Sequence, residues 1–239
     1  MDLKRRLLSQ SAVIFAGRIF GAGLIFLAQA AIARLWGATV LGEYLLIVAA
    51  ANIIAVVMPL GFETIGTYFA AEYRARGDGR SLRGFMVRAY GHVAATTAVM
   101  LVFGGFVLPM LGEPGRVLAQ HWVPSCLIAS GMAAIMVSGP LLVGMKHPYA
   151  GYFADGVFRP IFIIAALPFA AMAATPTMGF SQFVWMIASG IVAIALIHML
   201  YTISIVRRVK QDQPPRTGES RRWWRFALPW VVIVLATDF

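Results

Sequence analysis

Long apolar runs separated by short polar segments dominate the chain. A hydrocarbon core about 30 Å thick is crossed by a helix of about 20 mainly apolar residues. Six runs meet that length, at residues 11–33, 40–62, 84–110, 117–143, 150–174 and 181–206. The pattern therefore predicts an all-α fold, a polytopic bundle of six transmembrane helices. A seventh run starts near Phe226 and reaches the last residue, Phe239. We expect it to be the start of a further helix in a longer protein.

The composition supports a membrane protein and excludes a soluble domain. Hydrophobic residues make up 60% of the 239 residues and charged residues 13%, with a mean hydropathy of +0.78. A soluble fold of this size has too little interior to cover so much apolar surface. The single cysteine, Cys126, lies inside an apolar run, which excludes an intramolecular disulfide and a cysteine-based metal site. We expect no metal and no cofactor.

The distribution of basic residues predicts the orientation. Two of the 20 Lys and Arg residues, Arg34 and Arg116, fall in loops on one side of the predicted membrane. Three lie inside helices, and the other fifteen fall at the N-terminus and in alternate loops on the opposite side. Because Lys and Arg accumulate in cytoplasmic loops, the N-terminus is predicted to be cytoplasmic. The net charge of +10 thus reflects orientation, and no nucleic-acid partner is expected.

The charge pattern also divides the chain into three parts. Residues 1–206 form an N-terminal six-helix transmembrane lobe, residues 207–225 a basic cytoplasmic linker, and residues 226–239 the truncated start of a second lobe. The linker carries seven basic residues and the pair Trp223-Trp224. It is interpreted as a linker with aromatic anchors at the membrane interface. A patch that binds lipid headgroups is the alternative.

Two glycine-containing segments carry a family resemblance. Residues 33–44 read Ala-Arg-Leu-Trp-Gly-Ala-Thr-Val-Leu-Gly-Glu-Tyr, with Arg34, Gly37, Gly42 and Tyr44 in the pattern, and Gly61 lies in Pro-Leu-Gly-Phe-Glu-Thr at residues 59–64. An Arg-rich segment, predicted to be a loop, follows at residues 71–84. This pattern resembles the N-terminal half of the polysaccharide flippases, the O-antigen and capsule repeat-unit translocases of the multidrug/oligosaccharidyl-lipid/polysaccharide superfamily.

The resemblance implies a multi-pass transporter in the bacterial cytoplasmic (inner) membrane. Its substrate would be a polyprenyl-diphosphate-linked oligosaccharide used in polysaccharide biosynthesis. Its partners would be membrane lipids and other polysaccharide assembly proteins, and the complete transporter would have two similar halves. On physical grounds, Gly37 and Gly42 are expected to let the backbone turn between the first two spans. Trp36 and Tyr44 are expected to lie at the membrane interface.

Three arginines inside the predicted helices are candidate substrate-binding residues. Arg18, Arg88 and Arg159 lie about 10, 6 and 14 Å from the cytoplasmic ends of their helices, at 1.5 Å per residue. Charges at such depth are costly and usually functional, although long side chains near an end can reach the interface. Arg88, the shallowest, is the one expected to reach it. A guanidinium forms bidentate contacts with diphosphate oxygens, so the three arginines are predicted to line a cationic vestibule.

Two features of the sequence bear on this vestibule. Gly17 and Gly21 form a small-residue surface on which another helix can pack closely, which would turn Arg18 toward the bundle interior. Asp155 and Arg159 are four residues apart, so a helix places them on one face as an ion pair. Pro160 follows and makes a bend plausible. A diphosphate that takes Arg159 would free Asp155 for proton uptake. Asp155 and Asp238 are therefore candidate proton-coupling residues.

Other functional classes remain as alternatives. A cation or drug antiporter of the same superfamily would use the carboxylates of Asp155 and Asp238. A membrane scaffold or a glycan polymerase is the second alternative. The predicted outward loops, at residues 34–39, 111–116 and 175–180, are too short to build a catalytic site. The sequence also lacks a Gly-rich phosphate loop, a nucleophile elbow and a zinc signature. We therefore expect no enzyme.

Overall fold

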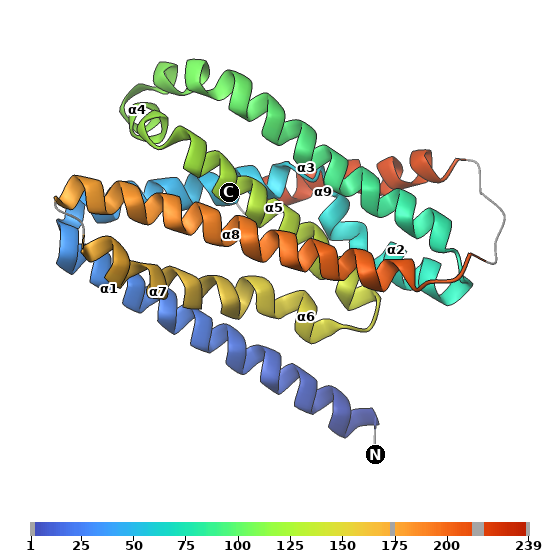
Figure 1. Ribbon diagram of the computed structural model, residues 1–239. Helices are drawn as coiled ribbons and strands as arrows, with labels where there is room; N and C mark the ends of the chain where they lie inside the picture. The colour runs from blue at the N-terminus through green and yellow to red at the C-terminus, as the bar shows by residue number, and fades with distance from the viewer. Residues whose placement is uncertain (1–2, 173–174, 212–217, 238–239) are drawn as a thin grey trace.

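The computed structural model describes residues 3–172, 175–211 and 218–237, and these residues form an all-α bundle (Figure 1). No strand occurs among them, which confirms the all-α part of the predicted fold class. The helices are α1 (Leu3–Val57), α2 (Phe62–Arg76), α3 (Gly79–Val107), α4 (Gly112–Gln120), α5 (Trp122–Gly144), α6 (Pro148–Phe153), α7 (Arg159–Ala171), α8 (Pro176–Arg207) and α9 (Glu219–Thr237). A 3₁₀ turn, η1 (Leu108–Leu111), precedes α4, and a π-helical turn, η2 (Ala154–Phe158), joins α6 to α7.

Five helical stretches in the described residues are long and apolar enough to cross a membrane. They are Ser9–Val57, Gly79–Gln120, Trp122–Gly144, Pro148–Ala171 and Thr177–Arg207. The chain is therefore a multi-pass membrane protein. The first stretch has 49 residues, about 74 Å at 1.5 Å per residue, which exceeds twice the thickness of a hydrocarbon core. Figure 1 shows that this stretch folds back on itself, so α1 comprises two antiparallel arms.

Gly37 makes the reversal within α1. Its φ of 90° and ψ of 173° belong to a backbone region that is essentially open to glycine alone. The predicted turn at Gly37 is thus confirmed. The prediction for Gly42 was wrong, because Gly42 lies within the second helical arm with open space around it. The Tyr44 side chain, in the same arm, is buried against Phe183, with ring centroids 6.0 Å apart.

The bounds of several predicted helices and loops differ from those in the structure. The helix predicted over residues 40–62 ends at Val57, and after a turn with Leu60 at φ 54° and Gly61 at φ 79°, α2 begins at Phe62. The Arg-rich segment 71–84 is not a loop, since it contains the end of α2 and the start of α3 around a short turn at Gly77. The outward loop predicted at 111–116 lies in η1 and α4, where Glu113 and Arg116 form an i,i+3 ion pair of 2.7 Å.

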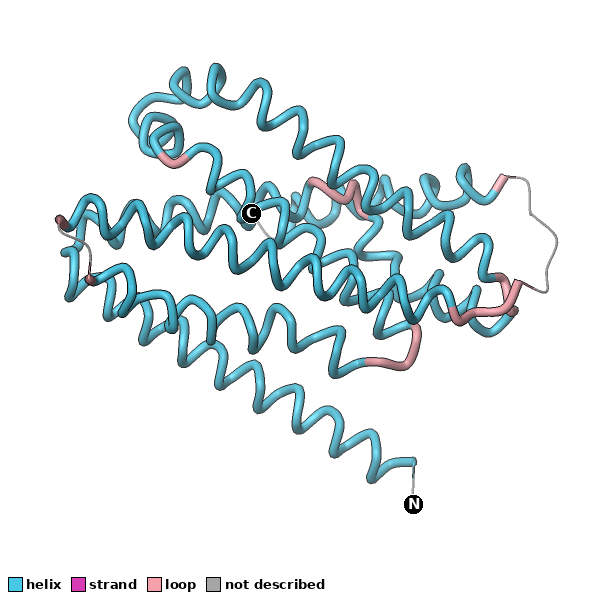
Figure 2. Tube along the Cα trace, viewed as in Figure 1, coloured by secondary structure: helices cyan, strands magenta, loops and turns pink. Residues whose placement is uncertain are grey.

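The α5 helix lies at the centre of the bundle and contacts α1, α2, α3 and α8 (Figures 1 and 2). Its interior positions are mostly small or aliphatic, which allows helices to approach closely in a membrane, where packing rather than apolar burial drives association. Gly131, for example, lies so close to Ile191 of α8 that an added Cβ would be 2.7 Å from the Ile191 Cγ2 atom.

The segments that carry most basic residues gather at one end of the bundle. In Figure 1 the N-terminus, the α2–α3 turn, the α5–α6 turn and the end of α8 lie at the right-hand end, whereas the Gly37 reversal, α4 and the end of α7 lie at the other. A backbone hydrogen bond of 2.9 Å from the Gly79 N–H to the Lys210 carbonyl joins two of these segments. The alternation that the charge pattern predicted therefore corresponds to two physical ends of the bundle.

The predicted linker at 207–225 is in part helical. Its last residues form the start of α9, which begins at Glu219 and packs against α2 and α3. Trp223 is 6% exposed and belongs to the core, and Trp224 packs edge-on against Phe62, with ring centroids 5.3 Å apart. Because Trp223 is buried against α2 and α3, it is not an exposed anchor as the sequence predicted, whereas the interfacial position of Trp224 stays a prediction. The close approach of α9 also explains Gly61, where an added Cβ would be 2.4 Å from the Ala227 carbonyl oxygen.

Candidate functional site

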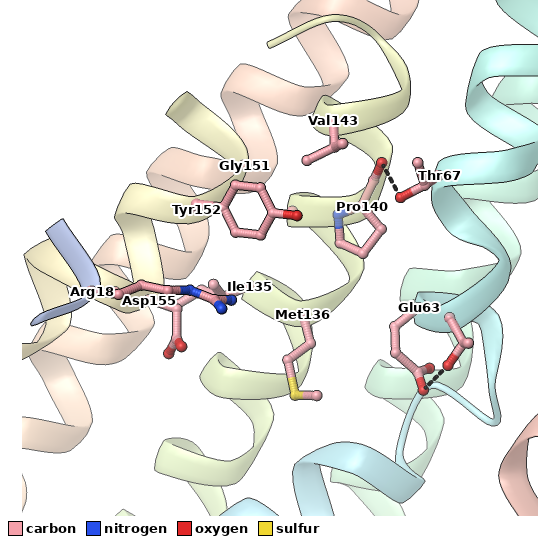
Figure 3. A pocket seen from close by; sticks show the side chains of 13 residues that line it. Arg18, Glu63, Thr67, Ile135, Met136, Pro140, Val143, Gly151, Tyr152 and Asp155 are labelled. Atoms are coloured by element: carbon pink, nitrogen blue, oxygen red, sulfur yellow. Dashed lines mark hydrogen bonds between the residues drawn. The ribbon is translucent and has the colours of Figure 1, made fainter. Parts of the chain in front are cut away.

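A cavity of about 350 Å³ lies between α1, α2, α5 and the α6–η2 segment (Figure 3). Polar side chains enter it from two sides. The polar and charged residues of its lining are Arg18, Glu63, Thr64, Thr67, Tyr152 and Asp155. Figure 3 shows Arg18, Tyr152 and Asp155 on one side and Glu63 and Thr67 on the other, with α5 behind them. A cavity with converging charged groups in a membrane bundle is the strongest candidate for a binding site.

Close packing of α1 against η2 sets the position of Arg18. An added Cβ at Gly21 would be 1.9 Å from the Gly156 carbonyl oxygen, and one at Gly17 would be 3.2 Å from Val157 Cγ2. The predicted small-residue surface is therefore confirmed. Pro160 has no N–H, so it cannot donate to the Gly156 carbonyl as a residue four positions later normally would. Arg18, on the same arm of α1, lines the cavity and remains exposed.

Arg18 has no carboxylate within ion-pair distance among the described residues. Its guanidinium carbon lies 5.2 Å from the centre of the Tyr152 ring, a cation–π contact that holds the group in place without neutralising its charge. The guanidinium donors therefore stay available to an anion that enters the cavity.

Asp155 and Arg159 form the predicted ion pair, with 2.8 Å between Asp155 Oδ1 and Arg159 Nε. The Asp155 side chain is 52% exposed, whereas that of Arg159 is 14% exposed. The residues before Pro160 form the π-helical turn η2, in which the Arg159 N–H donates to the Ala154 carbonyl five residues earlier. Such turns are frequent at functional sites. Asp155 lines the cavity, whereas Arg159 is not among the lining residues, so the prediction that Arg159 lines the vestibule was wrong.

Glu63 is the site residue that the sequence analysis missed. Glu63 lies in the Pro-Leu-Gly-Phe-Glu-Thr segment at residues 59–64. A single acidic residue next to an apolar run does not by itself indicate a binding site. The side chain is 8% exposed. The Thr64 hydroxyl donates to Glu63 Oε1 over 3.1 Å, while Oε2 is buried without a hydrogen-bond partner among the described residues. Burial raises the pKa of the Glu63 carboxyl, and the hydrogen bonds to its own backbone and to Thr64 oppose that rise.

The structure does not bring Arg88 to this cavity. Arg88 hydrogen-bonds to Ser220 of α9 and lies over the Trp223 ring, with its guanidinium carbon 5.8 Å from the ring centre. It lines a different pocket, between α3 and the start of α9. The prediction that all three arginines line one vestibule was therefore wrong. Arg34 is exposed near the Gly37 reversal at the opposite end. Asp238 lies outside the described residues.

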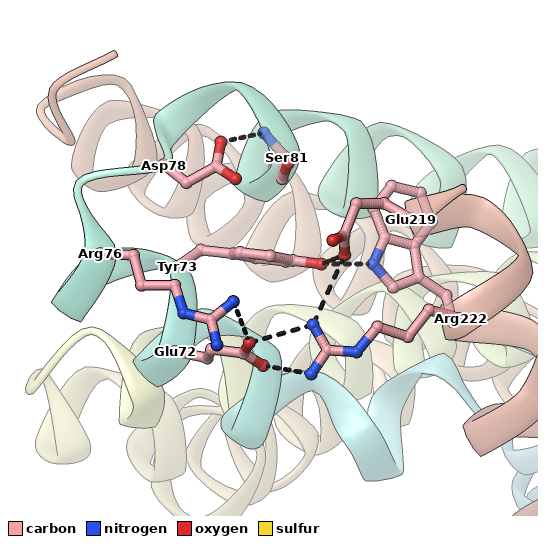
Figure 4. A network of polar contacts seen from close by, with 8 residues as sticks. Glu72, Tyr73, Arg76, Asp78, Ser81, Glu219 and Arg222 are labelled. Carbon is pink, nitrogen blue, oxygen red and sulfur yellow. Dashed lines mark hydrogen bonds and ion pairs between the residues drawn. The ribbon is translucent and has the colours of Figure 1, made fainter. Parts of the chain in front are cut away.

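A second group of charges joins α2 to α9 (Figure 4). The Arg222 guanidinium donates to both carboxylate oxygens of Glu72, over 3.0 and 2.9 Å, and Arg76 lies 2.6 Å from the same carboxylate. Arg222 also covers the Phe69 ring, with 5.0 Å from its guanidinium carbon to the ring centre. Glu219 lies 3.7 Å from Arg222. We call Glu72, Tyr73, Arg76, Glu219, Arg222 and Trp223 the α2–α9 network.

Tyr73 links the aromatic and charged parts of the α2–α9 network. Its hydroxyl donates to the Glu219 carboxylate and accepts from the Trp223 indole N–H over 2.7 Å. Burial and the hydrogen bond to Glu219 raise the pKa of Tyr73, so the phenol remains protonated. Each buried polar group in this chain of contacts has a partner. Such an arrangement is typical of a structural network.

The described residues contain no group of three or more His, Cys, Asp and Glu side chains that could hold a metal ion. The single cysteine, Cys126, is buried in α5 with a free thiol. No protein-family model matches the chain, and neither a curated protein nor a solved structure matches it significantly.

Proposed function

We propose that the chain is one lobe of a transporter that moves a polyprenyl-diphosphate-linked oligosaccharide across the bacterial cytoplasmic membrane. The diphosphate would bind in the cavity between α1 and α5. The observation that carries the proposal is Arg18, a guanidinium that lines a cavity in a membrane bundle and has no carboxylate within ion-pair distance among the described residues. The resemblance to polysaccharide flippases around Arg34, Gly37 and Gly61 supplies the substrate class.

The chemistry of the cavity suits a diphosphate. Arg18 offers a planar set of donors that matches two phosphate oxygens, and its stacking on Tyr152 reduces the entropy lost on binding. Asp155 is half-exposed and holds Arg159 by one short contact. An arriving diphosphate would compete with Asp155 for Arg159 and recruit a second guanidinium. Apolar lining residues such as Ile135 and Met136 would contact the adjoining part of the lipid.

The proposal includes six spans, a cytoplasmic N-terminus and access to the cavity from the cytoplasmic side. The gathering of basic segments at one end of the bundle supports it. Single cysteines test this orientation in a Cys126→Ala background. Ala75→Cys, at the basic end, should be protected from an impermeant thiol reagent in intact cells, and Thr177→Cys, at the other end, should be labelled. Labelling of Ala75→Cys alone would reverse the orientation.

A second candidate function rests on the other charges of the same cavity. Glu63 and Asp155 bring two carboxylates into the lining against one arginine, Arg18. A cation or drug antiporter would use such carboxylates to bind a positively charged substrate. The two functions differ in the part that Arg18 plays. The diphosphate transporter requires its positive charge, whereas a cation transporter would bind its substrate better without it.

The test compares Arg18→Gln and Arg18→Lys in the full-length protein, expressed where its loss abolishes surface polysaccharide. We expect Arg18→Gln to lower surface polysaccharide at least tenfold at unchanged protein abundance, and Arg18→Lys to retain part of it, because a lysine keeps the charge but loses bidentate contacts. Arg34→Gln, exposed at the opposite end, is the matched control and should export normally. Normal export by Arg18→Gln would contradict the proposal.

A further inference from the structure

The cavity contains a carboxyl group that the proposed diphosphate site does not use. Glu63, at the start of α2, is more than nine-tenths buried, and its Oε2 atom lacks a partner among the described residues. A buried carboxylate without a countercharge costs several kcal/mol, and such groups usually become neutral by taking up a proton. Within the part of the chain that the structure describes, the Thr64 hydroxyl is the one side-chain donor to the Glu63 carboxyl.

Among the described residues, no cation lies within ion-pair distance of the Glu63 carboxyl, so Arg18 acts on its charge only across the cavity. Across the cavity are Arg18, Tyr152 and Asp155 (Figure 3), and none of them contacts Glu63. The α5 wall facing it contributes the apolar side chains of Met136 and Pro140. On the other side of α2, His92 of α3 and Trp224 of α9 lie against the Phe62 ring, at centroid distances of 4.8 and 5.3 Å.

Asp155 is less suited than Glu63 to take up a proton, although the sequence analysis favoured it. Its carboxylate is 52% exposed and has Arg159 within 2.8 Å, so solvent and a cation both stabilise its charge. Glu63 has neither. Of the two carboxyl groups in the cavity, the geometry therefore favours Glu63 as the group that changes its protonation state.

We propose that Glu63 is the proton-binding site of the cavity and that it takes up one proton when an anion binds beside Arg18. The proposal rests on the proposed function of the cavity. With the cavity empty, the ionised Glu63 and Arg18 sum to zero charge, and the field of Arg18 favours the ionised form. A bound diphosphate cancels that field and repels the Glu63 carboxylate. A proton from the aqueous opening then forms the carboxylic acid, and its release accompanies release of the anion.

Carbodiimide labelling tests the proton site without any substrate. Dicyclohexylcarbodiimide reacts with protonated carboxyl groups in apolar surroundings, and mass spectrometry identifies the modified residue. In the purified full-length protein we expect labelling of Glu63 that increases as the pH falls, and stronger labelling of Glu63 in the presence of farnesyl diphosphate. Glu113, exposed and paired with Arg116, should stay unlabelled. Absence of label at Glu63 would overturn the proposal, as would protection by Na⁺ at constant pH, which would assign the site to an alkali cation.

Binding of farnesyl diphosphate at different pH values tests the coupling. For one linked proton, the dissociation constant should rise by up to about tenfold per pH unit above the pKa of Glu63. Glu63→Gln should bind tightly over the whole range, with only the pH dependence that the diphosphate itself contributes. The His92→Gln control should keep the wild-type profile. Equal profiles for the wild type and Glu63→Gln would overturn the coupling.

The two measurements separate failure of this proposal from failure of the proposed function. If Glu63 is labelled in a pH-dependent way but farnesyl diphosphate does not bind, the diphosphate function is wrong and Glu63 remains a proton site, without the proposed coupling. If farnesyl diphosphate binds, and Arg18→Gln abolishes the binding, while Glu63 stays unlabelled at every pH, the diphosphate site stands and the role of Glu63 is wrong.

Discussion

The two glutamates of α2, Glu63 and Glu72, differ in how their charges are compensated. Glu72 receives two hydrogen bonds from Arg222 and a third contact from Arg76. Glu63, at the other end of the helix, receives one hydrogen bond from Thr64 and has a buried oxygen without a partner among the described residues. The carboxylate of Glu72 therefore has its hydrogen bonds and its charge compensated, whereas that of Glu63, on the same helix, does not.

This difference separates structural from functional charge. A paired carboxylate contributes to stability, and its removal leaves the partner uncompensated. An unpaired charge in a cavity lowers stability and persists where function requires it. The same contrast holds for the arginines. Arg222 forms ion pairs within the α2–α9 network, whereas Arg18 lies over the Tyr152 ring and has no carboxylate within ion-pair distance in the described part of the chain. Variants in the α2–α9 network should therefore lower the stability of the protein, and variants of the charged cavity residues should lower its transport activity.

The largest loss of stability is expected from Arg222→Gln. It leaves Glu72 with Arg76 alone and removes the contact with Phe69. Because Arg222 is 30% exposed, the free energy of unfolding should fall by about 2 to 3 kcal/mol, less than for a fully buried pair. Thermal unfolding of the purified protein measures it, with the exposed neighbour Arg221→Gln as control. The double variant with Glu72→Gln should cost less than the sum of the single changes. Additive losses would show that Glu72 and Arg222 do not interact.

The next effect is expected from Gly21→Val, which changes packing beside the cavity and leaves every charge in place. The added side chain would overlap the Gly156 carbonyl, so α1 must move away from η2 at a cost of about 1 to 3 kcal/mol. Gly23→Val is the matched control, because a Cβ there meets nothing within 4 Å. Thermal unfolding and surface polysaccharide should both fall for Gly21→Val alone. Equal behaviour of the two variants would show that α1 does not pack against η2.

A smaller change in stability is expected at the Asp155–Arg159 pair. Because Asp155 is half-exposed, Arg159→Gln should cost about 1 kcal/mol or less. Exchange of the two residues, Asp155→Arg with Arg159→Asp, should restore protein abundance. It should not restore export, because the guanidinium moves about one helical turn. Recovery of both abundance and export would assign the pair to structure alone, and full export by Arg159→Gln at normal abundance would end its proposed role in binding.

The smallest effect is expected from Arg88→Gln. Arg88 is exposed, hydrogen-bonds to Ser220 and lies outside the cavity. Surface substitutions of this kind change stability by about 0.5 kcal/mol or less, and export should stay normal. Measurements of melting temperature and surface polysaccharide alongside Arg18→Gln provide the check. An equal loss of export in both variants would contradict the conclusion that Arg18 belongs to the binding site and Arg88 does not.

Local geometry explains which features could be predicted from the sequence. The Asp155–Arg159 pair and the Gly17–Gly21 surface follow from residue spacing on one helix, and Gly37 follows from the backbone freedom of glycine. The apolar runs likewise predicted the approximate positions of most of the helices along the sequence.

Contacts between distant segments could not be predicted in this way. Arg18 and Glu63 share a cavity because of the angle between α1 and α2, and Arg222 reaches Glu72 across 150 residues of sequence. Arg88 was misplaced for the same reason, since depth along a helix does not reveal which neighbour the helix faces. The burial of Trp223 could not be predicted either, because it results from the packing of α9 against α2 and α3.

The π-helical turn at η2 also changes which side of the helix the residues after it face. Each π turn holds one residue more than the corresponding α-helical turn, and one residue in an α-helix corresponds to about 100° of rotation. Everything after η2 is therefore rotated by roughly that angle relative to α6. Tyr152, before the turn, lines the cavity, while Arg159, after it, is directed into the bundle. Deletion of a single residue in this turn would thus be equivalent to rotating α7 about its own axis, with its sequence otherwise intact.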